Sequence, residues 1–424
     1  MEKNKKAELG WVFFDWANSA YSLVISTAIF PVFFLENSAE VIHFGPLSLS
    51  NASAYAFSVT AAYIVVCFTS PILSGIADYS GRRKLYMRVF TSLGSLSCIA
   101  LYFFDGPARQ YDALLAFMLA TASHAASLVF YDSYLSQIVT VDRADKLSAR
   151  GYAFGYAGSV LLMCLNVLMI QYPEWFGVPD GKTAARLAFL SVGIWWIAFS
   201  QLTFAWLPSD KRLPWQSDWI RRGYRELLKA AEHVKRQNYM RKYLVAFFFY
   251  SAGVQTVVYL ASSFAKQELK FETAELILVI LLLQVVAIAG ALFFAHLSKK
   301  TNNLWTLKTM ILIWALICLF AYFVHQQMEF YFLAGMVGLV LGGIQAISRS
   351  SYAKMIPKDH PDVTCFFSFY DVVYYLSIVF GTFAFGIINQ LTQSMRLSVL
   401  LLMVFFAVAW LILRKVPKNA LREA

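Results

Sequence analysis

Twelve apolar runs, each of roughly 18 residues or more, follow one another along the 424-residue chain. A helix of about 20 apolar residues is long enough to span the hydrocarbon core of a bilayer. Hydrophobic residues make up 59% of the chain and charged residues only 14%, which is not the composition of a soluble domain. The sequence therefore predicts an all-α membrane protein with twelve transmembrane helices, at 11–34, 52–76, 85–104, 112–139, 150–171, 184–207, 243–265, 274–297, 304–324, 329–348, 365–389 and 396–414.

The basic residues indicate how these helices are oriented. If the spans cross the membrane in turn, 30 of the 36 Lys and Arg residues fall on the side that also holds both termini. Cytoplasmic loops of membrane proteins carry an excess of Lys and Arg, so both termini are predicted to be cytoplasmic. The net charge of +11 is then an orientation signal, and we expect no nucleic-acid partner.

One long polar segment, 208–242, divides the chain into two halves of six spans each, 1–207 and 243–424. A weak repeat between 133–138 and 351–356 supports this division into two six-helix bundles. The linker carries ten basic and four acidic residues, together with an apolar stripe at helical spacing. This pattern is typical of an amphipathic helix on an anionic membrane surface, and a site for a specific partner is the alternative. The stripe comprises Trp219, Tyr224, Leu227, Leu228 and Ala231.

A loop motif carries the first resemblance to a known family. Residues 74–84 read Ser-Gly-Ile-Ala-Asp-Tyr-Ser-Gly-Arg-Arg-Lys. The segment resembles the cytoplasmic G-x-x-x-D-x-x-G-[RK]-[RK] signature of the major facilitator superfamily, with Ser74 at the position of the first glycine. The resemblance implies a secondary transporter whose two bundles rock about a solute site near the midplane. Gly81 permits a tight turn, and Asp78 is placed to face the positive N-terminal end of the span at 365–389.

A narrower resemblance is carried by residues 14–21, which read Phe-Asp-Trp-Ala-Asn-Ser-Ala-Tyr. This stretch is similar to the opening signature of the vacuole-effluxer-like branch of the superfamily, and 147–156, 343–350 and 366–371 fit the same branch. The resemblance implies a transporter, with amino acids as the leading substrate class because the branch includes autophagy-related amino-acid exporters. Many relatives carry a Gly-Lys pair where this chain has Tyr374 and Tyr375, which leaves room for a different substrate.

Ionisable residues inside the spans are the candidates for solute binding or proton coupling, because burying such groups in lipid is costly. Asp15 lies about one turn into the first span, and Asn18, Ser19 and Ser22 follow it at helical spacing. His124 lies near the middle of the fourth span. Proton coupling is a hypothesis based on Asp15, His124 and Asp371. The alternatives are that Asp15 locks a gate by pairing with a cytoplasmic cation and that His124 is bonded to a backbone carbonyl.

The remaining candidates for the solute site offer hydroxyls and amides, which suit a zwitterionic or neutral polar solute. Asp78, Arg82, Arg83, Asp132 and Arg349 are predicted to form a gate on the cytoplasmic side, with Asp132 pairing with Arg82 or Arg83. The further solute-site candidates are Ser127, Tyr250, Gln255, Tyr259, Gln345, Tyr374 and Tyr375.

Several classes of protein are disfavoured. The chain lacks a phosphate-binding loop and the common hydrolase motifs, so we expect neither an ATP-driven pump nor an enzyme. Its five cysteines form no C-x-x-C pair, and we expect no metal and no cofactor. We expect a monomer surrounded by lipid in a bacterial inner membrane. Two alternatives stay open: another cargo, such as a peptide, nucleoside-like metabolite, drug or lipid, and a membrane sensor that does not transport.

Overall fold

A computed structural model describes residues 2–209, 218–357, 360, 362–392 and 394–417. The chain divides into two compact units. The first comprises Met1–Asp132 and Phe154–Trp219, and the second comprises Ser133–Ala153 and Ile220–Ala424. Segment 133–153 therefore leaves the first unit partway along the chain and packs with the second.

The first unit begins with α1 (Glu2–Ala20), which runs through a π-helix (Tyr21–Ile29) into α2 (Phe30–Asn37). An antiparallel hairpin of β1 (Val41–Phe44) and β2 (Leu47–Ser50), with Val41 opposite Ser50, leads into the longer helices. These helices are α3 (Asn51–Ser80), α4 (Arg83–Ala100), α5 (Gln110–Ser133), α7 (Ala144–Gln171) and α8 (Gly181–Trp206). The short helix α6 (Leu135–Ile138) and the first part of α7 lie in segment 133–153.

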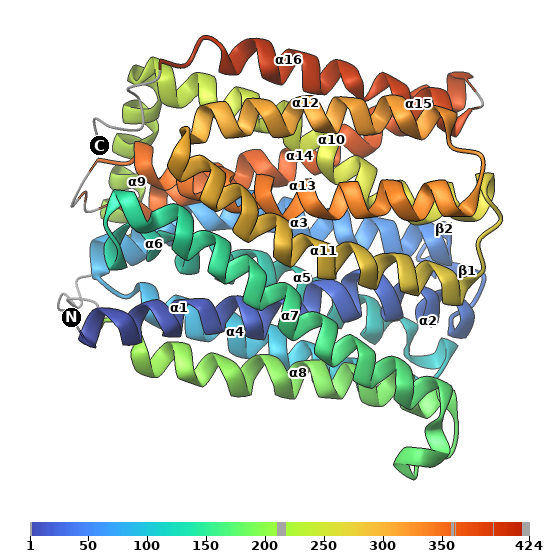
Figure 1. The fold of residues 1–424 in the computed structure, drawn as a ribbon. Coiled ribbons are helices and arrows are strands. Elements are labelled where there is room, and N and C mark those ends of the chain that lie inside the picture. The colour runs from blue at the N-terminus through green and yellow to red at the C-terminus, as the bar shows by residue number, and fades with distance from the viewer. Residues whose placement is uncertain (1, 210–217, 358–359, 361, 393, 418–424) are drawn as a thin grey trace. The chain divides into compact units, whose positions relative to one another are not determined.

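The second unit contains a surface helix followed by long helices whose axes lie nearly along one line, with successive helices running in opposite directions (Figure 1). They are α9 (Trp219–Arg236), α10 (Asn238–Glu268), α11 (Thr273–Lys300), α12 (Asn303–Phe323), α13 (Gln327–Met355), α14 (Val363–Thr392), α15 (Met395–Leu401) and α16 (Met403–Leu413). Capping boxes begin two of them: Glu272 with Glu275 at α11, and Gln326 with Glu329 at α13. Each satisfies backbone N–H groups that have no partner within the helix.

The predicted membrane-spanning helices are present. Among the described residues, eleven segments are long and apolar enough to cross a bilayer. The seventh predicted span, 243–265, falls within α10, which is 31 residues long. The last predicted span is formed by α15 and α16 together, with a break at Leu402. The prediction of an all-α membrane protein is confirmed.

Two local features differ from the predicted regular helices. The first span was predicted as one helix over 11–34, yet nine of its residues are π-helical and the Phe30 N–H bonds to the carbonyl of Ile25. Such segments are rare and often lie at functional sites. The β1–β2 hairpin was not predicted either. It forms in the polar stretch after the first span, where Ile42 is buried and packs inward while Val41 and Leu47 are exposed.

The turn predicted at Gly81 is confirmed. Gly81 ends α3 in the left-handed region, with φ of 59°, a conformation that costs glycine little. The reversal brings Asp78 and Arg83 together: the Arg83 Nε lies 2.6 Å from the Asp78 carboxylate, whose side chain has no exposed surface. The loop motif therefore forms its own ion pair.

Helices α11 and α13 pack through glycines whose missing side chains permit close approach of the backbones. A Cβ atom at Gly338 would lie 2.5 Å from the carbonyl oxygen of Leu283, and one at Gly342 would overlap the carbonyl of Ala287. By contrast, a Cβ at Gly335, on the same helix α13, would meet no atom within 4 Å. The contact between these helices depends on particular glycines.

We expect Gly342→Ala to lower the melting temperature of the purified protein by several degrees. The added methyl group overlaps backbone atoms that cannot move aside, and overpacking of this kind typically costs about 1–3 kcal/mol. Gly335→Ala is the matched control and should leave the melting temperature unchanged or slightly raised. Equal effects of the two substitutions would contradict the packing described here.

Candidate functional site

Asp15 is buried in the first unit and is held by a tyrosine. Its side chain is 4% exposed, and its Oδ2 accepts a hydrogen bond from the Tyr131 hydroxyl at 2.7 Å. Trp11 fixes Tyr131 in turn, because the indole Nε1 donates to the Tyr131 carbonyl at 3.0 Å and the two rings stack with centroids 4.5 Å apart. A carboxylate therefore lies inside an apolar helix unit with a hydroxyl oriented toward it.

A second cluster in the first unit surrounds His124, which is half-buried. The imidazole lies between the rings of Tyr21 and Trp196, at centroid distances of 5.0 and 5.9 Å. The Tyr21 hydroxyl and the Thr121 Oγ1 are 2.6 Å apart. Tyr21 is the first residue of the π-helix, so the irregular backbone lies beside this ring cluster.

The other predicted solute-site residues of the first unit lie in different environments, from buried to exposed. Ser127 is buried, and its hydroxyl donates to the His124 carbonyl at 2.8 Å, so it is used within its own helix. Asn18 is buried, whereas Ser19 is half-buried and faces the position of Gly155. Ser22 is exposed. The polar stripe that was predicted to follow Asp15 therefore does not share one environment.

The predicted gate residues of the first unit lie near the ends of their helices. Arg83 contacts Asp78 as described above, and Arg82 is half-buried. The neighbouring Lys84 donates to the carbonyl of Leu207 at 2.6 Å. Asp132 is 6% exposed at the end of α5. Its predicted pairing with Arg82 or Arg83 stays a prediction.

In the second unit, two tyrosines of α10 converge on Ser348 of α13. The Tyr250 hydroxyl is 2.7 Å from the Ser348 Oγ, and the Tyr243 hydroxyl donates to the Ser348 carbonyl at 2.9 Å. Gln255 is buried, Gln345 is half-buried, and Tyr259 is exposed. The hydroxyl of Tyr250 is thus engaged in the packing of α10 on α13.

The tyrosines that replace the Gly-Lys pair lie on α14, one turn beyond Asp371. Tyr374 is half-buried and stacks at 6.2 Å on Phe247 of α10. Tyr375 is buried edge-on to Tyr374, with ring centroids 5.4 Å apart. Asp371 itself is 5% exposed. Phe247, Tyr374 and Tyr375 therefore form a chain of ring contacts between α10 and α14.

Arg349 joins two of the stretches that carried the family resemblance. It lies on α13, is 2% exposed, and its Nε and Nη2 donate to the Oγ and the carbonyl of Ser148 at 3.0 and 3.1 Å. Its guanidinium also lies 4.1 Å from the centroid of the Tyr152 ring. Stretches 147–156 and 343–350 are therefore in direct contact, through a cation that donates and stacks at once.

Next to this contact lies a buried ion pair that the sequence analysis did not identify. The Lys354 Nζ is 2.6 Å from the Asp145 Oδ2, and each side chain is 9% exposed. Asn303 donates to Asp145 at 2.7 Å and accepts from Lys354 at 3.1 Å, and Ser298 donates to Asp145 at 3.2 Å. Both oxygens of Asp145 therefore accept hydrogen bonds, and the Lys354 ammonium donates to Asp145 and Asn303, so each buried charge has polar partners.

The sequence offered little to find this pair. Lys354 was counted among the cytoplasmic basic residues, and its partner lies 209 positions away. The one available signal was the proximity of Asp145 to the 147–156 stretch. We call Asp145, Ser148, Tyr152, Arg349 and Lys354, with Asn303 and Ser298, the 145–354 network.

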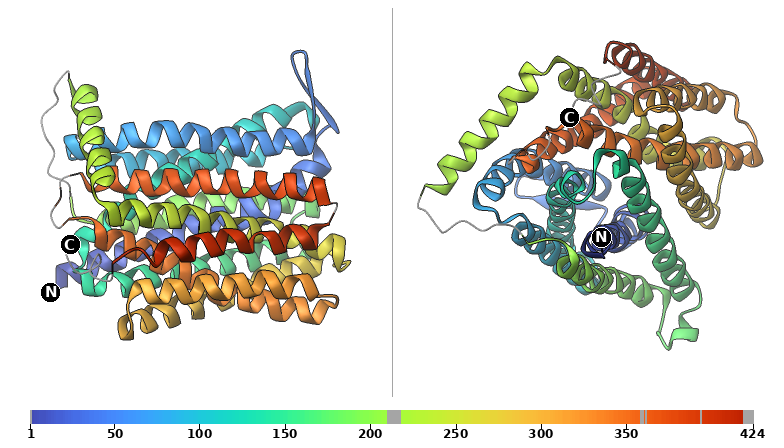
Figure 2. Two further views of the ribbon diagram at one scale, coloured as in Figure 1. Left: turned by 90° about the horizontal axis from the view of Figure 1, so that it is seen from above. Right: turned by 60° about the vertical axis from the view of Figure 1, so that its left-hand side comes forward.

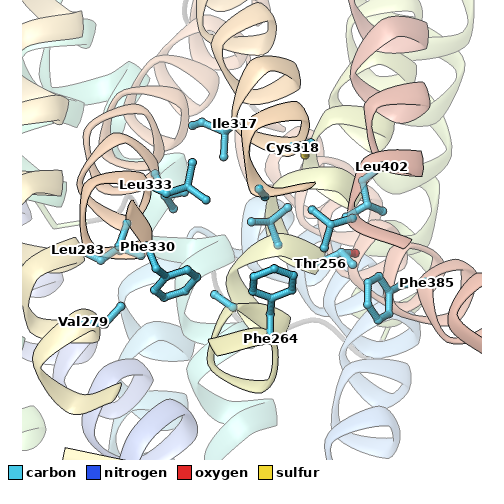
Figure 3. A pocket seen from close by; sticks show the side chains of 16 residues that line it. Thr256, Phe264, Val279, Leu283, Ile317, Cys318, Phe330, Leu333, Phe385 and Leu402 are labelled. Atoms are coloured by element: carbon cyan, nitrogen blue, oxygen red, sulfur yellow. The ribbon is translucent and has the colours of Figure 1, made fainter. Parts of the chain in front are cut away.

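An apolar pocket of about 50 Å³ lies inside the second unit (Figure 3). Its lining residues come from helices α10, α11, α12, α13, α14 and α15. Phe264, Phe330 and Phe385 line it, together with aliphatic side chains. Thr256 supplies a hydroxyl that is buried and has no hydrogen-bond partner within the described part of the chain. This pocket does not suit a polar solute. Among the described residues, no group of His, Cys, Asp or Glu is placed to hold a metal ion.

We expect Thr256→Val to stabilise the protein. Valine has the same shape and removes a buried hydroxyl that has lost its hydration without gaining a partner, a situation that costs about 1–3 kcal/mol. Thr306→Val is the matched control, because the buried Thr306 hydroxyl donates to the Asn302 carbonyl at 3.0 Å. Thermal unfolding should show a rise for the first variant and a fall for the second. A fall for Thr256→Val would contradict the assignment.

The long apolar helices and the loop motif fit a transporter of the major facilitator superfamily, and the comparisons with known proteins agree. The family described as "Vacuole effluxer Atg22 like" matches residues 3–423, and the chain belongs to this family. An uncharacterized MFS-type transporter YxiO of Bacillus subtilis (strain 168) is 29% identical over 99% of this chain and 96% of its own. Autophagy-related protein 22 of Kluyveromyces lactis is 26% identical over 86% of this chain and 79% of its own.

Solved structures support the same fold. FucP, a major facilitator transporter solved in the outward conformation, aligns with a TM-score of 0.72 over 97% of this chain and 98% of that chain, at 13% identity. Family, relatives and fold are those of transporters, so the expectation that the protein is not an enzyme is confirmed. The two resemblances found in the sequence are confirmed as well.

Proposed function

We propose that this protein carries amino acids across a bacterial inner membrane by alternating access, coupled to protons through Asp15. The branch that the sequence resembles includes amino-acid exporters, and the candidate solute-site residues are mainly hydroxyls and amides. The observation that carries the coupling hypothesis is the hydrogen bond between the buried Asp15 and Tyr131. We propose that the carboxyl group of Asp15 gains and loses the coupled proton at this position.

The protonation state of Asp15 would matter because the charged form is costly to bury. The ionised carboxylate is stabilised where the Tyr131 hydroxyl reaches it, and the protonated form needs that bond less. A change of conformation that separates Asp15 from Tyr131 would give the carboxyl group a different environment, and this is how we propose that proton movement is linked to the transport cycle. His124, which lies between the rings of Tyr21 and Trp196, is the second candidate for proton transfer, and Tyr21 is the first residue of the π-helix.

The 145–354 network supplies the proposed gate. It attaches segment 133–153, which continues into α5 and α7, to helices α11, α12 and α13. We propose that these contacts form in one state of the transport cycle and separate in the other. Separation would expose the charges of Lys354 and Asp145 to water. Their hydration would then offset the loss of their mutual attraction.

Solute counterflow in proteoliposomes tests the substrate class. Liposomes containing the purified protein are preloaded with one unlabelled amino acid, and entry of the labelled compound is followed without an imposed gradient. We expect exchange for a subset of amino acids and none in liposomes without protein. Absence of exchange for every amino acid, from protein shown to be folded, would reject this class. The same assay would then be repeated with peptides, nucleoside-like metabolites, drugs and lipids.

A further inference from the structure

Helix α9 presents an exposed face on which two large apolar side chains lie among five cations. Tyr224 is 52% exposed and Leu228 is 51% exposed. We propose that this face binds the headgroups of anionic phospholipids, and we call it the α9 lipid face. The proposal does not depend on the transported solute. The exposed cations of the face are Arg221, Arg225, Lys229, Lys235 and Arg236.

Protein contacts fix which side of α9 is available. Gly223, Leu227 and Ala230 recur at helical spacing and are buried, so this side of α9 faces the protein. In the last turns, the His233 ring lies edge-on to Phe366 at the start of α14, with centroids 5.4 Å apart. The stripe predicted from the sequence is therefore split in two. Leu227 faces the protein, while Tyr224 and Leu228 leave about half of their surface exposed.

The connection to α10 places α9 at the level of the headgroups. Only Gln237 separates the end of α9 at Arg236 from the start of α10 at Asn238. The apolar run of α10 begins at 243, so at about 1.5 Å per residue the last turn of α9 lies about 10 Å from the beginning of the run. Figure 2 shows α9 lying across the direction of the long helices of its unit. A helix parallel to the bilayer at this depth places its apolar side chains in the headgroup and upper acyl region.

The charges of the α9 lipid face favour an anionic lipid over a neutral one. Lys229 pairs with Glu226, and Arg236 pairs with Glu232. Within the described part of the chain, Arg221, Arg225 and Lys235 form no ion pair. These three cations flank Tyr224 and Leu228, so phosphate groups can be bound by Arg and Lys while the adjacent apolar side chains enter the upper acyl region. An acidic soluble partner would match the charges but not the position beside a spanning helix.

Site-specific photo-crosslinking tests the proposal on the full-length protein. p-Benzoylphenylalanine is introduced at Leu228, and the purified protein is reconstituted in liposomes of phosphatidylcholine and phosphatidylglycerol in equal parts. After illumination, mass spectrometry identifies the adducts. We expect lipid adducts in which phosphatidylglycerol is enriched several-fold over phosphatidylcholine. The same group at Leu227 should crosslink within the chain, because that side chain faces the protein.

Neutralising the three unpaired cations separates binding from mere proximity to the bilayer. The variant Arg221→Gln/Arg225→Gln/Lys235→Gln should still form lipid adducts at position 228, with phosphatidylglycerol no longer enriched. Lys300→Gln, at an exposed cation on α11, should leave the enrichment unchanged. The proposal is overturned if the adducts at 228 contain the two lipids equally in the unaltered protein. It is also overturned if no lipid adduct forms, or if crosslinking in native membranes captures a protein instead.

Discussion

Replacing Lys354 with Met is expected to destabilise the protein by about 3–5 kcal/mol, because it leaves the buried Asp145 carboxylate without its cation. The two side chains are only 9% exposed and 2.6 Å apart, so a charge left without its partner would stay largely out of contact with water. Asp145→Asn should have a comparable effect for the opposite reason, leaving a buried ammonium group. Lys300→Met, at an exposed lysine on α11, is the control and should leave the melting temperature nearly unchanged.

The double variant Asp145→Asn/Lys354→Met gives the decisive comparison. Removing both charges also removes the cost of burying them, so the double variant should be more stable than either single variant. Transport should distinguish a gate from a purely structural pair. If the network closes one state of the cycle, the double variant should fold, and its rate of solute exchange should differ from that of the unaltered protein. Additive losses of stability from the two substitutions would contradict the pairing.

Asp15→Asn is expected to abolish accumulation driven by a pH gradient, with a loss of at least tenfold, while counterflow of solute persists. The amide has the shape of the carboxyl group, and its oxygen can accept a hydrogen bond from the Tyr131 hydroxyl, but it does not ionise in the physiological pH range. Tyr131→Phe should retain coupling, since the carboxyl group remains when its hydrogen bond is removed.

Two measurements in the same proteoliposomes check this prediction. Uptake under an imposed pH gradient reports coupling, and counterflow without a gradient reports binding and movement of the solute. His124→Ala serves as the comparison, because it removes the other candidate for proton transfer. Full gradient-driven uptake by Asp15→Asn would exclude Asp15 from coupling, and loss of uptake by His124→Ala alone would transfer the role to the imidazole.

The fold was predictable because long apolar runs leave a chain few alternatives to spanning a membrane. Motif spacing was equally informative at Gly81, where the left-handed turn follows from the local sequence. The ion pair between Asp78 and Arg83 was not predicted. The irregular part of the first span was hidden, since a π-helix over Tyr21–Ile29 has no hydrophobic period that distinguishes it from the α-helix around it. The β1–β2 hairpin was short enough to be lost in a polar loop.

The candidate site was predictable only where one residue stood out from its surroundings. Asp15 and His124 are polar groups in apolar runs, so their positions were found, but Tyr131 as the partner of Asp15 was not. Asp145 and Lys354 appeared to be ordinary loop charges, because nothing in the local sequence shows that 133–153 packs against helices more than 150 residues later. Pairings over such distances depend on the tertiary structure.

Segment 133–153 belongs to the first half of the sequence but packs with the second unit. This has a consequence for cutting the chain into two fragments. A cut in the linker between 209 and 218 would produce two fragments that match the sequence halves and not the compact units. The C-terminal fragment would contain Arg349, Lys354 and Asn303 without Ser148 and Asp145. Those cations would be buried without partners or would disorder the helices that carry them. The two halves are therefore expected to become stable only when they are produced together, as complementary fragments of one folding unit.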